Sequence, residues 1–161
     1  MKPNPSTHPA RHAAGFTLIE MMVAMVMVAI LASIAIPSYR SYVRRGQLAE
    51  AFTTLADMRV KMEQWYQDNK YYGDASGSTT CPTLTNYSAF PVSGKYFAIS
   101  CGGLGAAPAQ TYTLTATGVA GGLTAGYAYT INQNGIKATT SFDSQASTAT
   151  CWLTKAAGCD N

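Results

Sequence analysis

A single carboxylate stands inside a long apolar run near the start of this 161-residue chain. Glu20 is the only charged residue between positions 16 and 36. At about 1.5 Å per residue, a helix over this run would be about 31 Å long, which matches a hydrocarbon core of about 30 Å. A charge at the centre of a spanning helix costs roughly 2.5 to 3.5 kcal/mol on insertion scales, and such residues mark functional sites. We therefore expect Glu20 to have a partner there, an amine.

The residues around Glu20 resemble a known processing signal. Gly15 is followed directly by the sequence FTLIE of residues 16–20, and a short basic leader precedes it. This arrangement resembles the class III signal of type IV prepilins. The resemblance implies that a prepilin peptidase removes the leader 1–15 after Gly15 and methylates the new terminus, Phe16. It also implies that Glu20 contacts the terminal ammonium of a neighbouring subunit during assembly, which involves an inner-membrane machinery.

Two other interpretations of the apolar run remain open. A secretory signal peptide would have a shorter apolar region of about 7 to 15 residues followed by a small-residue site, and residues 32–35 could serve as that site. Glu20 would then be unexplained, and the helical pattern would not be expected to continue beyond Pro37. A simple single-pass anchor is the second alternative, in which Glu20 is merely tolerated.

The chain is expected to have three parts after the leader. Residues 16–37 form the membrane-spanning and assembly helix, residues 38–70 its amphipathic continuation, and residues 71–161 a globular head. Past Pro37, apolar residues recur every three or four positions, the spacing of one buried stripe. Pro37 removes a backbone hydrogen bond and favours a kink, and the pilin resemblance implies that the helix loosens there in the filament. The stripe comprises Phe52, Leu55, Met58, Met62 and Trp65 or Tyr66.

The head is predicted to contain a four-stranded antiparallel sheet. Tyr, Thr, Ile and Phe are enriched in residues 95–101, 111–117, 127–132 and 136–141, which is typical of strands. Asn134-Gly135 between the last two runs predicts a type I′ hairpin, which needs positive φ at both central residues. The expected fold is α+β, a long helix packed on this sheet, and the resemblance implies the same pilin fold.

Cysteine placement indicates where the head lies. Four cysteines follow the apolar run, an even set typical of disulfides in an oxidising compartment such as a periplasm. Basic residues on both sides of the run leave the orientation undecided by themselves. Three pairings are open, and we favour Cys81–Cys101 and Cys151–Cys159 because both close short loops. A zinc site is the alternative, but the close cysteine spacing of such sites is missing, so no metal and no cofactor are expected.

Catalysis is not expected of this chain. Its only histidines, His8 and His12, lie in the leader, so the processed protein would lack the commonest general base. No nucleophile or phosphate-loop motif is present. The remaining acids are dispersed at helical spacing and are interpreted as a solvated helix face: Glu50, Asp57, Glu63, Asp68 and Asp74.

The resemblance favours a structural subunit of an extracellular pilus that serves adhesion, twitching motility or DNA uptake, with major and minor subunits undistinguished. A DNA-receptor minor pilin is the first alternative, with Lys95, Lys137 and Lys155 as phosphate contacts. Removal of the leader would lower the net charge of the chain from +3 to +1, so only a local basic patch could bind DNA. A pseudopilin of type II secretion is the second alternative. Trp152 is interpreted either as a surface contact or as a plug at the sheet edge.

Overall fold

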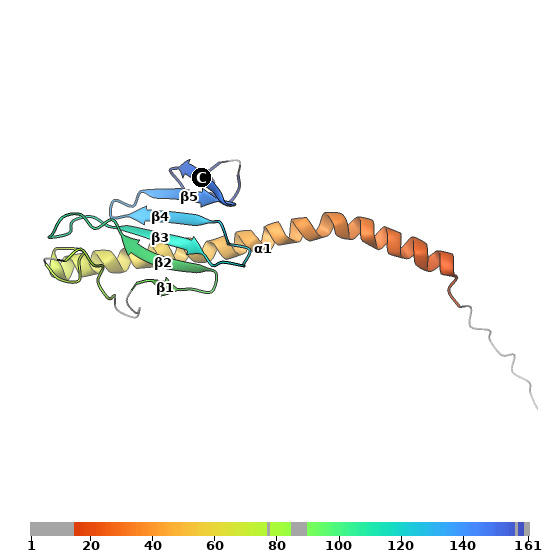
Figure 1. Cartoon of the computed structure of the whole chain (residues 1–161), viewed down its shortest axis with the longest axis horizontal. Helices are drawn as coiled ribbons and strands as arrows, with labels where there is room; N and C mark the ends of the chain where they lie inside the picture. The colour runs from red at the N-terminus through yellow and green to blue at the C-terminus, as the bar shows by residue number, and fades with distance from the viewer. Residues whose placement is uncertain (1–14, 77, 85–89, 157, 160–161) are drawn as a thin grey trace, which may run out of the picture. The chain divides into compact units, whose positions relative to one another are not determined.

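The computed structural model describes residues 15–76, 78–84, 90–156 and 158–159 (Figure 1). One helix, α1, runs from Leu18 to Asn69 over 52 residues and continues through Pro37. A capping box starts it: Glu20 N–H donates to Thr17 Oγ1 (3.3 Å), and Thr17 N–H donates to Glu20 Oε2 (2.8 Å). The chain divides into two compact units, Met1–Tyr39 and Arg40–Asn161.

The described part of the first unit is dominated by exposed apolar side chains. An 18-residue window of α1 near the N-terminus has a mean hydropathy of 2.5 and is not buried at all. Phe16, Leu18 and Met25 each expose more than 70% of their surface. Length and composition therefore make α1 a candidate membrane span.

The second unit contains a six-stranded antiparallel sheet in which every strand pairs with its neighbours in sequence (Figure 1). The prediction of four strands was wrong in number, because one strand was missed at each edge of the sheet. The four expected runs correspond to the four central strands. The strands are β1 (Val92–Ser93), β2 (Phe97–Gly102), β3 (Thr113–Gly118), β4 (Ala128–Asn132), β5 (Lys137–Phe142) and β6 (Gln145–Ala149).

The two edge strands lack the signals that identify a strand in sequence. β1 is only two residues long and is a strand because it pairs with β2, where Val92 lies opposite Ile99. β6 is small and polar, without aromatic or aliphatic alternation. Its hairpin with β5 turns through Asp143 and Ser144, both with positive φ (52° and 66°), the backbone of a type I′ turn. An Asp-Ser pair is a weaker turn signal than Asn-Gly, so the hairpin was not predicted.

The turn between β4 and β5 also differs from the prediction. Gly135 has a φ of 73°, whereas Asn134 is not among the residues with positive φ. The Gly135 N–H donates to Asn132 O (2.9 Å), and the Asn132 N–H donates to Ile136 O (3.2 Å). These bonds describe a three-residue loop with glycine in the left-handed position, not a two-residue type I′ turn. The glycine is needed, but at the end of the turn.

The core of the second unit lies between α1 and one face of the sheet. Leu55, Met58 and Met62 from the predicted stripe are fully buried, and Leu48 and Ala51 extend it toward the N-terminus. Phe52, Trp65 and Tyr66 are half-buried and pack against this core. From the sheet, the predicted alternation is confirmed, because Tyr127, Tyr129 and Ile131 are all buried.

Candidate functional site

Glu20 lies in the first turn of α1 and is held by its own neighbour. Both the Thr17 backbone N–H and the Thr17 hydroxyl donate to Glu20 Oε2, each at 2.8 Å. These bonds satisfy part of the hydrogen-bonding demand of a carboxylate in an apolar setting. Because both use Oε2, the other oxygen is the one that an amine could approach. Glu20 also lines an almost entirely apolar hollow of about 320 Å³ whose other walls are Ile19, Val23, Ala24 and Met27.

The predicted processing residues lie just ahead of the helix. Gly15 and Phe16 are exposed and precede the first helical residue, Leu18. A Cβ on Gly15 would meet nothing within 4 Å. The described residues of the fold therefore place no steric demand on a glycine at position 15. Pro37 lies inside α1, between its apolar and amphipathic parts.

The structure joins Cys81 to Cys101 and Cys151 to Cys159. The first bond ties the segment after the helix to strand β2, and the second closes a loop beyond β6. This loop is also fixed to the sheet by hydrogen bonds. The Thr139 hydroxyl donates to Cys151 O (2.6 Å) and accepts from Leu153 N–H (2.9 Å).

The Trp152 ring lies against Lys137, one of the three lysines predicted to contact DNA. The Lys137 ammonium lies 4.6 Å from the centre of the Trp152 ring, within the range of a cation–π interaction. The ring also stacks on Phe52, with centroids 5.0 Å apart and planes at 5°. The indole N–H donates to Thr130 O (2.8 Å). Trp152 is half-buried and has these three partners, which fits the interpretation as a plug better than that of a surface contact.

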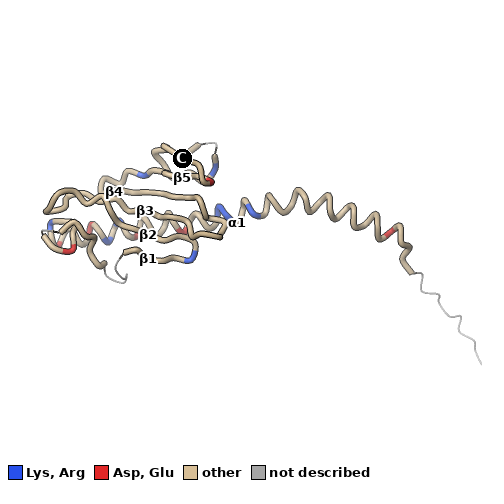
Figure 2. Tube along the Cα trace, viewed as in Figure 1, with Lys and Arg blue, Asp and Glu red and all other residues tan. Residues whose placement is uncertain are grey.

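The three candidate lysines do not form one cluster. Lys137 and the Cys151–Cys159 loop that carries Lys155 belong to the β5–β6 side of the sheet, where Lys155 makes a β-bridge with Gly158. Lys95 lies on the turn between β1 and β2, at the opposite edge, with its ammonium 4.9 Å from the Tyr96 ring centre. Figure 2 likewise shows basic residues beside β1, along α1 and near the C-terminus rather than in one stripe.

Two acids interpreted as a solvated helix face accept hydrogen bonds from other parts of the head instead, and that prediction was wrong for both. Glu50 Oε1 accepts hydrogen bonds from the backbone N–H groups of Tyr96 (2.8 Å) and Phe97 (3.1 Å). A Cβ on Gly94 would lie 2.6 Å from the same oxygen and 2.7 Å from the backbone oxygen of Phe97, which cannot give way easily, so the turn needs a glycine there. Glu50 thereby fixes the turn that carries Lys95 to helix α1.

Glu63 is the second of these acids, and it binds two tyrosines. The Tyr72 hydroxyl donates to Glu63 Oε2 (3.0 Å), and the Tyr112 hydroxyl donates to Glu63 Oε1 (3.1 Å). Burial raises the pKa of both tyrosines, and the Glu63 carboxylate raises each further. One turn earlier, Arg59 Nη2 donates to Gln133 O (3.4 Å). Glu63 directly follows the stripe residue Met62 in sequence, but this position alone does not distinguish it from the solvated acids.

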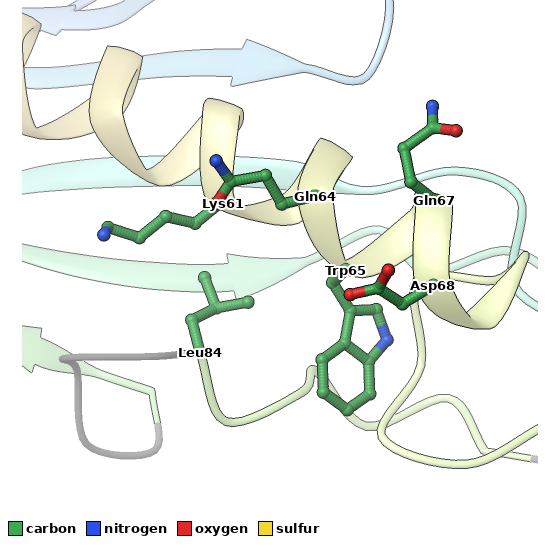
Figure 3. A pocket seen from close by; sticks show the side chains of 6 residues that line it. All are labelled: Lys61, Gln64, Trp65, Gln67, Asp68 and Leu84. Carbon is green, nitrogen blue, oxygen red and sulfur yellow. The ribbon is translucent and has the colours of Figure 1, made fainter.

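A surface pocket lies between α1 and Leu84, which belongs to the segment that follows the helix (Figure 3). Its volume is about 380 Å³. The Trp65 indole forms one wall and is fixed by a hydrogen bond from its N–H to Gly73 O (3.0 Å). The other lining residues are Lys61, Gln64, Gln67 and Asp68. No group of three or more His, Cys, Asp or Glu side chains in the described residues could hold a metal ion.

Comparison with known families accounts for both units. Residues 10–36 match the model of the prokaryotic N-terminal methylation motif, and residues 37–152 match the model described as type IV minor pilin ComP, DNA uptake sequence receptor. The chain belongs to the ComP family of type IV minor pilins. Its long helix and antiparallel sheet are the pilin fold, and the pilin family is structural rather than enzymatic.

Several curated relatives are fimbrial proteins. The pilin is 34% identical over 110 residues to fimbrial protein EcpC of Eikenella corrodens, covering 68% of this chain and 67% of that one. It is 40% identical over 60 residues to the type IV major fimbrial protein FimA of Dichelobacter nodosus, covering 37% of this chain and 38% of FimA. Among solved structures, the non-core minor pilin PilV of Neisseria meningitidis is 22% identical, with a TM-score of 0.44, covering 66% of this chain and 95% of that one.

Proposed function

We propose that this type IV pilin is a minor subunit that binds DNA through the β5–β6 side of its head. The observation that carries the proposal is the Lys137 ammonium held over the Trp152 ring, inside the region that matches the ComP model. Trp152 is itself fixed by Phe52 and by Thr130 O. The ammonium is therefore presented in a defined place, as a phosphate contact that positions a protein on DNA requires.

The charge of the pilin supports local rather than bulk attraction. The whole chain carries only +3, and Lys2 and Arg11 of the leader account for two of these charges. A protein that neutralises few phosphates should show a shallow dependence of DNA affinity on salt, because each contact releases about one counterion. Lys155 lies in the disulfide-closed loop beyond Trp152 and would add a second contact on the same side.

The test is DNA binding by the full-length pilin in detergent, measured at several salt concentrations. Lys137→Gln should weaken binding to duplex DNA and reduce the slope of log affinity against log salt by about one. Trp152→Leu should have a similar effect, because the ammonium loses its support, and the double variant should be little worse than either single one. Lys61→Gln, on the helix, is the control for lost charge. Equal slopes for Lys137→Gln and the wild type would contradict the proposal.

We also propose how the pilin is processed and anchored before assembly. The peptidase cuts between Gly15 and Phe16 and methylates Phe16, residues 16–36 hold the protein in the inner membrane, and the head lies in the periplasm, where both disulfides are stable. Support comes from the methylation-motif match at residues 10–36 and from the exposed apolar surface of this segment. Gly15→Val should block the cut. The result is read from the size of the protein on a gel, where a mature-sized product would contradict this step.

A further inference from the structure

The stretch of α1 that directly follows the apolar run carries exposed cations and an exposed aromatic ring. Arg40 and Arg45 are exposed, and so is Tyr42 between them, 73% of whose surface is accessible. Arg44 differs, because its guanidinium lies 5.5 Å from the centre of the Tyr127 ring and so belongs to the head. Among the described residues, no ion pair is found for Arg40 or Arg45. We call Arg40, Tyr42 and Arg45 the collar.

The collar residues point to different sides of the helix. At 3.6 residues per turn, Arg40 and Arg45 are separated by about 140° around the axis. Tyr42 and Arg45 border a shallow hollow of about 450 Å³, together with Val43 and Gly46. A Cβ on Gly46 would meet nothing within 4 Å, so this side of the helix is open. The hollow is therefore lined by an aromatic, an aliphatic and a basic residue.

Along α1, the Cα of Arg40 falls within the headgroup layer of a membrane and that of Arg45 lies beyond it. That layer adds about 5 to 7 Å on each side of the hydrocarbon core. With Ile36 at the end of the core, the helix rise places the Arg40 Cα about 6 Å further along the axis and that of Arg45 about 13 Å. Helical side chains lean toward the N-terminus, so both arginines reach back toward the bilayer. Tyrosine is enriched at this same level, where its ring is apolar on one end and polar on the other.

From these observations we infer that the collar binds the phosphate groups of anionic phospholipids before assembly. This inference rests on the proposed membrane anchorage of residues 16–36. Guanidinium groups match phosphate geometry and bind it in a bidentate manner. A lipid surface explains cations on opposite sides of one helix, because headgroups surround a spanning helix completely. DNA would be expected to contact cations gathered on a single face.

The experiment uses the full-length pilin in vesicles of equal parts phosphatidylglycerol and phosphatidylcholine. The protein is extracted in mild detergent, and the lipids that remain bound are counted by native mass spectrometry. The wild type should retain phosphatidylglycerol in preference to phosphatidylcholine. Arg40→Gln and Arg45→Gln should each lower this preference by about fivefold, the effect expected for one basic side chain near an anionic surface. Arg40→Lys combined with Arg45→Lys preserves the charges and should retain most of the preference.

The matched control is Lys61→Gln combined with Lys95→Gln, which removes the same charge from outside the collar and should leave lipid retention unchanged. Equal retention of both lipids by wild-type protein, or equal loss in the control, would overturn the inference. Loss of DNA binding by the collar variants with lipid retention intact would overturn it too and assign the collar to DNA. If alkaline carbonate washes the wild type off the vesicles, the anchor itself is refuted, and the collar with it.

Discussion

The hydrogen bonds from Thr17 to Glu20 show how a carboxylate can be accommodated at the start of an apolar helix. Two donors from the residue three positions earlier converge on one oxygen at 2.8 Å. The acid is thereby partly satisfied without any second chain, which lowers the cost of placing it next to hydrocarbon. The second oxygen remains available for a partner, so one residue can serve both the single subunit and the assembled state.

Glu20→Ala should therefore spare processing but prevent incorporation into the filament. The new Phe16 ammonium would meet no carboxylate in an apolar bundle, and an unpaired buried charge is strongly unfavourable. The measurement compares whole cells with sheared pilus fractions by immunoblot. Met25→Leu, at an exposed apolar position of the same helix, is the control and should assemble normally. Wild-type amounts of Glu20→Ala protein in the sheared fraction would contradict the role of Glu20.

Tyr112 should make the stability of the head fall at alkaline pH. Burial, together with Glu63, raises the pKa of Tyr112 above its ordinary value of about 10. Below that pH both folded and unfolded chains keep the proton. Above it the unfolded chain ionises first, so the free energy of unfolding declines as the pH rises toward the folded pKa, by up to about 1.4 kcal/mol per pH unit.

The test compares the wild type with Tyr112→Phe. The free energy of unfolding of each protein is measured in denaturant at pH values below and above about 10. The variant loses the hydrogen bond to Glu63, worth about 1 kcal/mol at neutral pH, but its stability should decline less steeply with pH. Identical pH slopes for the two proteins would show that Tyr112 ionises equally easily in both states.

At the residue scale, Glu20 stood out in the sequence because it is the only charge in its run. The family match over residues 10–36 confirms the resemblance of this region to a prepilin, and the role of Glu20 stays a prediction. Glu50 and Glu63 could not be assigned in this way. Their partners Tyr96, Phe97 and Tyr112 lie 46 to 49 residues away from them in sequence. Helical spacing alone does not reveal which acids make such distant contacts.

At the scale of elements, the ends of two strands allow a matched test of close packing. Gly118 ends β3, and a Cβ there would overlap the Thr124 carbonyl group. Gly102 ends β2, and a Cβ there would meet nothing within 4 Å. Gly118→Ala should destabilise the head by about 1 to 3 kcal/mol because backbone must move, whereas Gly102→Ala should be within about 0.5 kcal/mol of the wild type. Thermal or denaturant unfolding measures both, and equal effects would contradict the close approach of Thr124 to Gly118 in the β3–β4 connection.

The prediction of elements from sequence was accurate where periodicity was strong. The helix stripe and the alternating face of β4 were both recognised because large apolar residues recur at the period of the element. β1 and β6 were missed because their pairing comes from the sheet and not from their own residues. The β4–β5 turn was located by its Asn-Gly pair, but its type depended on which residue took the left-handed conformation, and Gly135 alone did so.

At the scale of the whole molecule, the two units suit different surroundings. The apolar part of α1 has no buried window, while the stripe that follows forms the core of the head. As a type IV pilin, the protein assembles with other pilins. We expect that assembly to exchange lipid for protein around the apolar part, so that this surface never has to meet water. The head then requires its own stability, to which the two disulfides contribute.

The most direct test of the proposed processing and assembly is the identity of the first residue of the natural protein. Pili are sheared from cells, the protein is purified, and its N-terminal peptide is analysed by mass spectrometry. We predict a peptide that begins with N-methylated Phe16 and contains an unmodified Glu20. A protein in the sheared fraction that begins at any other residue, or that retains the leader, would contradict this prediction.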